Sequence, residues 1–182
     1  MRLGLVGYGV GGRLFHAPYI QAAEDVELVG VVTTDPTRRA QVAEDLPGMP
    51  VYDSLTALLA AGVDAVTITT PPQTRRDLVL EALSAGAHVV ADKPFAPSAT
   101  AARDLAQAAR DAGRLLAVFH NRRWDTDVRT VRQVLDSGRL GDLWRVESRF
   151  ELDQPEGLEA GPSGGLLRDL GTHVVDQMLW LL

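Results

Sequence analysis

The fold is decided by the stretch Arg2-Leu3-Gly4-Leu5-Val6-Gly7-Tyr8-Gly9-Val10-Gly11-Gly12. Its first residues form a short apolar run typical of a buried strand, and a helical pattern follows over residues 11–23. Between them, residues 7–12 match Gly-x-Gly-x-x-Gly, a motif that is informative when it joins a strand to a helix. The stretch therefore predicts a strand–turn–helix unit that opens a sheet with helical connections.

Each glycine of the motif has an expected role. Gly7 permits the tight turn, Gly9 lets a pyrophosphate approach the backbone, and Gly12 lets the helix pack closely on the strand. Backbone amides at the start of the helix would then bind the phosphates. We predict that a dinucleotide binds at Gly7, Tyr8, Gly9, Val10 and Gly12. The alternative is a glycine-rich turn without a ligand.

Strand and helix patterns alternate through the residues that follow. Further strands are expected at 26–33, 51–52, 65–69, 87–91 and 115–119, and helices at 37–45, 54–61, 74–84 and 98–112. Ser54 and Ser98 are expected to cap two of the helices. Six strands with helical connections predict a doubly wound parallel α/β sheet. We assign residues 1–119 to one dinucleotide-binding domain.

The pattern changes after residue 119. Helices are expected at 125–137 and 166–182, an alternating strand at 143–152, and a loop rich in Pro and Gly at 154–165. A single strand needs a pairing partner, and a helix that finishes on Leu-Trp-Leu-Leu needs a surface to pack on. We interpret residues 120–182 as the incomplete amino-terminal part of a substrate and oligomerisation domain. A longer chain is the favoured source of the remainder, and a separate chain is the alternative.

Composition excludes several classes of protein. The 182 residues are 46% apolar and 23% charged, which indicates a globular chain with a core. The formal charge of −6 disfavours nucleic-acid binding, and no apolar run approaches the roughly 20 residues of a membrane span. Without cysteine there is no thiolate nucleophile or zinc–thiolate site. Because the strand pattern begins at residue 2, we expect no signal peptide and a cytoplasmic protein.

The end of the second strand bears on the choice between NAD and NADP. Enzymes that use NAD often carry Asp or Glu about 20 residues beyond the glycine loop, but Thr33 and Thr34 stand in that region. Hydroxyl groups together with the guanidinium of Arg38 would hold a 2′-phosphate. The sequence therefore favours NADP, while Asp35 keeps NAD open.

Only one of the 18 basic residues is a lysine. Lys93 lies in Asp92-Lys93-Pro94, just after the fifth expected strand, at the sheet edge where ligands bind in such folds. Chance or arginine-rich codon usage would also leave a single lysine. The position favours a functional ammonium group, which arginine does not replace.

A second polar set, Asp169, His173 and Asp176, is spaced i, i+4, i+7 in the helix expected at 166–182. On one continuous helix these side chains share a face, which is either solvated or part of a site. An Asp–His–Asp metal site fits the spacing but needs a further ligand, and we predict no metal.

Further motifs follow the glycine loop in a fixed order: Phe15-His16-Ala17-Pro18, Thr69-Thr70-Pro71-Pro72, Ala85-Gly86-Ala87-His88-Val89, Asp92-Lys93-Pro94, His120-Asn121-Arg122-Arg123, Gly138-Arg139-Leu140-Gly141 and Asp169-Leu170-Gly171-Thr172-His173-Val174-Val175-Asp176. In this combination the chain resembles the glucose–fructose oxidoreductase / inositol dehydrogenase (Gfo/Idh/MocA) family over essentially its whole length. Two positions depart from the family pattern. Asp92 replaces the usual Glu of Glu-Lys-Pro, and Arg75 stands where His is often found. Family members are also typically longer.

The resemblance implies a Rossmann domain followed by an α/β domain with an open sheet. It implies NAD(P)-dependent hydride transfer between the nicotinamide and a carbinol carbon of a sugar, cyclitol or similar polyol. Three catalytic residues are implied. Lys93 would polarise the carbonyl oxygen, Asp169 would orient substrate hydroxyls, and His173 would act as general acid/base.

The remaining implied contacts divide between cofactor and substrate. The cofactor contacts outside the glycine loop are Thr33, Thr34, Arg38, Thr70, Pro71, Pro72, Asp92 and Lys93. The substrate contacts are Asn121, Arg122, Asp169 and His173. Two alternatives to a self-sufficient enzyme stay open: a non-catalytic dinucleotide-binding sensor or regulatory protein, and one part of a split enzyme. A homo-oligomer is expected unless missing carboxy-terminal residues complete the surface.

Overall fold

The computed structural model describes residues 1–151, 153 and 165–182. These residues form two compact units, Met1–Phe119 and His120–Leu182. The first unit is built on a parallel sheet, and the regular elements of the second, among its described residues, are all helices. Among the described residues, no helix is both long and apolar enough to cross a membrane.

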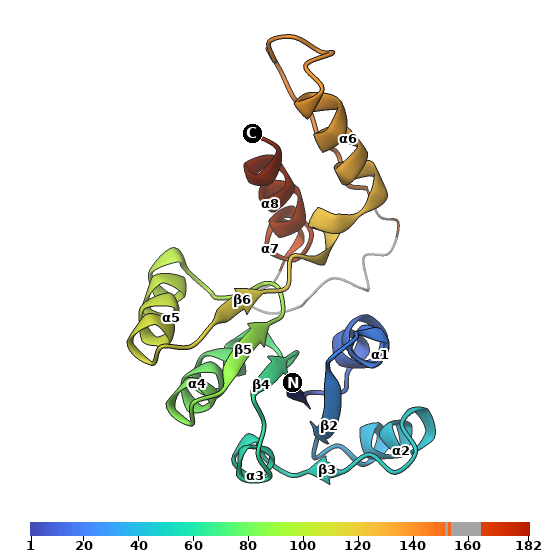
Figure 1. Cartoon of the computed structure of the whole chain (residues 1–182), viewed down its shortest axis with the longest axis vertical. Coiled ribbons are helices and arrows are strands. Elements are labelled where there is room, and N and C mark those ends of the chain that lie inside the picture. The colour runs from blue at the N-terminus through green and yellow to red at the C-terminus, as the bar shows by residue number, and fades with distance from the viewer. Residues whose placement is uncertain (152, 154–164) are drawn as a thin grey trace. The chain divides into compact units, whose positions relative to one another are not determined.

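Six strands of the first unit form one sheet in the order β3-β2-β1-β4-β5-β6 (Figure 1). Their bounds are β1 (Arg2–Val6), β2 (Glu27–Val32), β3 (Val51–Tyr52), β4 (Ala65–Ile68), β5 (His88–Ala91) and β6 (Leu116–Val118). Every neighbouring pair is parallel. The order of strand addition reverses beside β1, and in such sheets ligands bind beyond the carboxyl ends of the strands at that point. The predicted doubly wound α/β sheet is confirmed.

Helices cover both faces of the sheet (Figure 1). One face packs on α1 (Ala17–Ala22) and α2 (Pro36–Asp45), and the other on α3 (Leu55–Ala60), α4 (Pro72–Ser84) and α5 (Ala99–Asp111). Because side chains alternate along a strand, Leu5 belongs to the first core and its neighbour Val6 to the second. The sheet edge that follows Val6 is thereby held between two packed layers.

Two of the helix starts follow from single serines. The Ser54 hydroxyl accepts a hydrogen bond from the Ala57 N–H at 3.1 Å, and Ser98 accepts one from Ala101 at 3.2 Å. Both predicted N-caps are confirmed. The helix expected at 11–23 begins instead as a π-helical segment, η1 (Gly11–His16), before α1. Pro18 has no N–H to donate to the preceding turn, and the helix type changes just before it.

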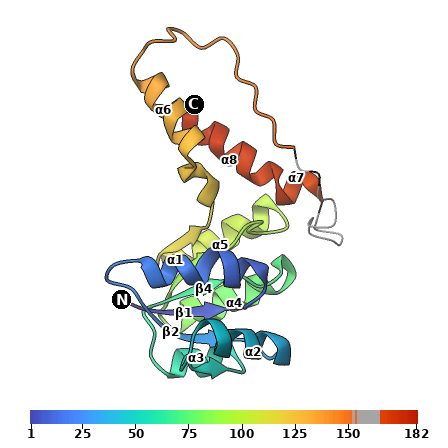
Figure 2. The ribbon, with the colours of Figure 1, turned by 90° about the vertical axis from the view of Figure 1, so that its right-hand side faces the viewer.

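The second unit consists of η2 (Asn121–Trp124), α6 (Thr126–Asp136), α7 (Leu166–Asp169) and α8 (Gly171–Leu181) where it is described. Helix α8 packs beside η2 and α6 (Figure 2). The rings of Trp124 and Trp180 meet edge to face, with 5.9 Å between their centroids. This contact joins the start of the unit to the chain's last helix.

Two predictions for the second unit are wrong. Residues 143–151 form no strand, and Trp144 among them is 96% exposed. No other described segment of this unit is a strand, so the alternating pattern has no ladder to join. The single helix expected at 166–182 is two helices, interrupted at Leu170. Residues 152 and 154–164, which include nearly all of the expected loop, lie outside the described residues.

Candidate active site

The glycine loop follows β1 directly and has the geometry that its motif requires. Gly7 has a φ of +96°, a backbone conformation that residues other than glycine rarely adopt. A Cβ on Gly12 would lie 2.2 Å from the Gly7 carbonyl oxygen, so only glycine fits there. The Thr69 hydroxyl, at the end of β4, donates to the carbonyl oxygens of Val6 and Gly7 at 3.1 and 3.0 Å. The loop is therefore fixed from two neighbouring strands.

Gly9 leaves the outer surface of this loop open. A Cβ placed on Gly9 would meet nothing closer than the Arg38 guanidinium, at 3.8 Å. The partly exposed backbone of Gly9 is the kind of surface that a pyrophosphate approaches in dinucleotide-binding proteins. The loop geometry thus fits a dinucleotide, and the expected contacts of Tyr8 and Val10 stay predictions.

The expected ribose end of the site contains two arginines and a carboxylate that caps a helix. Asp35 caps α2, and its Oδ1 accepts a hydrogen bond from the Arg38 N–H at 3.0 Å. The Arg39 guanidinium is paired with Asp53. Among the described residues, the Arg38 side chain has no such ion pair and lies beside Gly9. Thr33 is buried and Thr34 is exposed at the end of β2.

Two loops follow β4 and β5 at the same edge of the sheet. Thr70 and Pro71 lie in the first loop, and Pro72 begins α4 with its ring buried. Asp92 and Lys93 lie in the second, where the Lys93–Pro94 peptide bond is cis. Both loops are carried by strands whose carboxyl ends lie on the same side as Gly7. The structure thus brings together the glycine loop and the expected nicotinamide contacts.

Asp92 is held against the start of the first helix. Its Oδ1 accepts a hydrogen bond from the Lys93 N–H at 2.7 Å. Its Oδ2 lies 3.4 Å from His16 Nε2 and would lie 3.0 Å from a Cβ on Gly11. The carboxylate therefore spans the space between the Lys93 loop and η1. A glutamate at this position would be one methylene longer and would require a different arrangement.

His16 is a site residue that the sequence reasoning did not single out. Its side chain is buried and its ring stacks on Phe119, with 4.1 Å between the ring centroids. It lies beside Asp92, which follows β5, two strands away from β1 in the sheet. The available signal was a histidine in the motif that directly follows the glycine loop.

In the second unit, Asp169 and His173 are both buried, with exposed fractions of 7% and 4%. Asp169 ends α7, and His173 lies in the first turns of α8. The His120 ring stands edge-on to the His173 ring, with 6.5 Å between the centroids. A solvated helix face is therefore excluded for these two side chains.

Asp176 has a structural partner. The Arg123 guanidinium donates to its carboxylate, with 3.1 Å between Nε and Oδ2. This hydrogen bond is the main cause that raises the pKa of Arg123. Within the described residues, no group of three or more metal-ligating side chains lies close enough to hold an ion.

The two expected substrate residues of η2 are placed by α8. The Arg122 carbonyl accepts a hydrogen bond from Gln177 at 3.0 Å. The Arg122 guanidinium lies 3.5 Å from the Asp125 carboxylate and 4.7 Å from the centre of the Phe150 ring. Asn121 is partly buried. These contacts place η2 and the His173 helix in one packed cluster.

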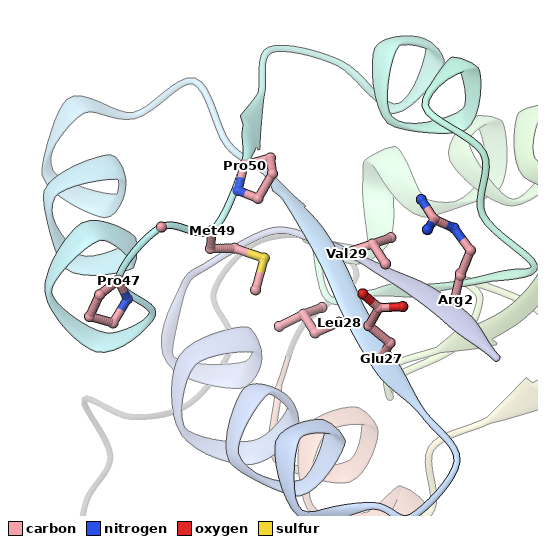
Figure 3. Close-up of a pocket in the computed structure, with 8 residues that line it drawn as sticks. Arg2, Glu27, Leu28, Val29, Pro47, Met49 and Pro50 are labelled. Atoms are coloured by element: carbon pink, nitrogen blue, oxygen red, sulfur yellow. The ribbon is translucent and has the colours of Figure 1, made fainter.

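A pocket lies at the other end of the strands from the glycine loop, where β1 and β2 begin (Figure 3). Arg2 and Glu27 line it together with Leu28, Val29 and the segment from Pro47 to Pro50. None of the predicted site residues is among them. The pocket is therefore separate from the glycine loop and the Lys93 loop.

Comparisons with protein families match both parts of the chain. Residues 1–120 match the model described as "Oxidoreductase family, NAD-binding Rossmann fold". Residues 128–182 match the model described as "GFO/IDH/MocA C-terminal domain".

Curated relatives match over the whole chain. The chain is 38% identical to the uncharacterized oxidoreductase YdgJ of Escherichia coli, covering 100% of this chain and 53% of that protein. It is 31% identical to scyllo-inositol 2-dehydrogenase (NADP(+)) IolW of Bacillus subtilis, covering 100% and 51%. The chain thus spans about half the length of the curated relatives it matches.

Solved structures agree with this relationship. A putative oxidoreductase from Klebsiella pneumoniae is 41% identical with a TM-score of 0.89, covering 100% of this chain and 50% of that one. An oxidoreductase from Agrobacterium radiobacter, solved with NAD+, L-tartaric acid and magnesium, is 27% identical with a TM-score of 0.87, covering 100% and 54%. With both family models matched in order along a doubly wound sheet, the chain belongs to the Gfo/Idh/MocA family of oxidoreductases with an NAD-binding Rossmann fold.

Proposed function

We propose that the chain belongs to an enzyme that transfers hydride between NADP and a carbinol carbon of a sugar, cyclitol or similar polyol. One observation carries the proposal: the chain's single lysine follows β5 at the sheet edge that also carries the glycine loop. A family of dinucleotide-dependent oxidoreductases supplies the reaction type. Residues 1–119 serve as the dinucleotide-binding domain, and residues 120–182 begin the domain for substrate binding and oligomerisation.

The chemistry divides between the cofactor and the side chains. A bound nicotinamide supplies the acceptor for hydride. His173 takes the hydroxyl proton of the alcohol as hydride leaves the carbon, and later passes that proton to water. The Lys93 ammonium stabilises the negative charge that develops on the oxygen. Asp169 is buried at the end of α7, four residues before His173. It orients the substrate hydroxyls together with Asn121 and Arg122.

The proposal specifies NADP over NAD. The Arg38 guanidinium lies beside Gly9, and the Asp35 carboxylate is engaged as the cap of α2. Thr33 and Thr34 offer hydroxyls next to them. Among the relatives, IolW carries NADP(+) in its name, whereas the Agrobacterium radiobacter structure contains NAD+.

Titration of the purified chain with NADP and NAD tests the cofactor. We expect tighter binding of NADP, and Arg38→Gln should raise its dissociation constant about tenfold while that for NAD stays within about twofold. Arg39→Gln is the matched control, because Arg39 is already paired with Asp53. Tighter binding of NAD by the unaltered chain would show that the NADP assignment is wrong.

Turnover of sugars and cyclitols tests the chemistry. Lys93→Met and His173→Gln should each lower turnover by at least about a hundredfold, because each removes a charge or a proton acceptor needed only during reaction. The dissociation constant for NADP should change by less than about threefold. Binding without turnover in the unaltered chain would favour the sensor or the split enzyme instead.

A further inference from the structure

Arg75 is a buried cation that donates hydrogen bonds to three backbone carbonyl groups. It lies in the first turns of α4, and only 2% of it is exposed. Its Nη2 donates to the Thr70 carbonyl at 2.5 Å. Its Nη1 donates to the Asp92 carbonyl at 2.6 Å and to the Pro94 carbonyl. One guanidinium thus joins the loop after β4 to the loop after β5.

The position of these carbonyls gives the contact its meaning. Asp92 and Pro94 flank Lys93, and the same nitrogen of Arg75 holds both of their carbonyl oxygens. The backbone on either side of Lys93 is therefore fixed. The Thr70 carbonyl belongs to the loop that carries the expected nicotinamide contacts.

We propose that Arg75 is a positioning residue that sets the direction of the Lys93 side chain relative to the Thr70 loop. The planar guanidinium has five N–H donors in a fixed fork, so it reaches three carbonyls at once. A neutral imidazole has a single N–H donor, and a lysine ammonium has three donors but no planar fork. Hydrogen bonds from a charged donor are also stronger than those between neutral groups, which suits a junction between two loops.

The inference depends on the proposed function only for the catalytic role of Lys93. The junction itself is a property of the chain and is measured without turnover. Because Lys93 is the only lysine, lysine-selective ¹⁵N labelling gives a single backbone amide signal. That N–H donates to the Asp92 carboxylate at 2.7 Å, so its chemical shift reports the geometry of the loop.

The experiment compares Arg75→Met with Arg76→Met in the purified chain. Arg76 is the next residue of α4, and its side chain is 58% exposed. We expect the Lys93 signal to move or split in Arg75→Met and to stay in place in Arg76→Met. The dissociation constant for NADP should rise about tenfold in Arg75→Met alone, because the Thr70 loop, which carries expected nicotinamide contacts, loses its hydrogen bond to Arg75. If Arg75→Met does not fold, Arg75→Gln, which keeps two N–H donors, replaces it.

The outcomes separate this inference from the proposed function. A folded Arg75 variant with the Lys93 signal and the NADP affinity of the unaltered chain would overturn the positioning role. A moved Lys93 signal in a chain that binds neither NADP nor NAD would support the junction and contradict the proposed cofactor. A lowered melting temperature with an unchanged Lys93 signal would assign Arg75 a purely structural role and also overturn the inference.

Discussion

At the scale of single residues, the roles of the motif glycines could be predicted from the sequence because each position has a distinct steric requirement. Gly7 requires a positive φ and Gly12 faces a carbonyl oxygen, and both needs follow from the strand–turn–helix context. His16 and Arg75 could not be predicted as site residues from the sequence. Their importance comes from contacts with Asp92 and its neighbours, which are distant in sequence and depend on how strands β1, β4 and β5 line up.

Gly9→Ala and Gly12→Ala should separate binding from stability. A Cβ on Gly12 would lie 2.2 Å from a backbone oxygen, so Gly12→Ala should lower the free energy of unfolding by about 2 kcal/mol or more. A Cβ on Gly9 meets nothing closer than 3.8 Å, so Gly9→Ala should leave stability nearly unchanged. It should still weaken dinucleotide binding about tenfold, because the methyl occupies the approach of the pyrophosphate.

Urea unfolding and dinucleotide titration measure the two effects. Equal stability of Gly12→Ala and the unaltered chain would contradict the close packing of helix on loop. Undiminished binding by Gly9→Ala would contradict the expected path of the pyrophosphate.

At the scale of elements, apolar runs predicted the six strands because parallel strands are buried on both faces. The alternating segment at 143–152 predicted a strand that residues 143–151 do not form. Alternation indicates a strand only when a partner strand is present. The polar spacing in 166–182 included two buried residues, Asp169 and His173. The prediction drawn from it required one continuous helix. The break at Leu170 left no clear signal in that spacing.

The contact between Tyr8 of the glycine loop and Asp45 of α2 should respond to high pH. Burial, with the hydrogen bond to Asp45 at 3.1 Å, raises the pKa of Tyr8 to about 12. The folded state then holds this proton more tightly than the unfolded state does. Its stabilising contribution is complete below the unfolded pKa of about 10 and is lost as pH rises toward 12.

Urea unfolding should therefore show a loss of about 1 kcal/mol from this group between about pH 9 and pH 11. Tyr8→Phe should remove that part of the pH dependence. Tyr19→Phe is the control, because Tyr19 is 68% exposed. The same pH dependence in Tyr8→Phe would mean that another group is responsible.

At the scale of the whole molecule, burial is distributed unevenly. The two apolar cores lie within Met1–Phe119. Among the described residues of His120–Leu182, only Val128, Asp169 and His173 are buried, and two of these are polar. Hydrophobic burial is the main favourable contribution to folding, so we expect the second unit to be the less stable of the two.

Hydrogen exchange should show this difference directly. Amides of α6 and α8 should exchange at least about tenfold faster than those of β1 and β4. Peptide-resolved mass spectrometry measures both sets in one sample. Equal protection of the two units would show that the second gains stability from contacts beyond its own buried side chains.

The edge-to-face indole pair of Trp124 and Trp180 has a spectroscopic consequence. All three tryptophans of the chain, at 124, 144 and 180, fall in the second unit, whereas the three tyrosines fall in the first. Emission excited selectively at the indoles therefore reports one unit alone, and far-ultraviolet ellipticity is weighted toward the other. The chain carries its own pair of optical reporters, without any introduced label.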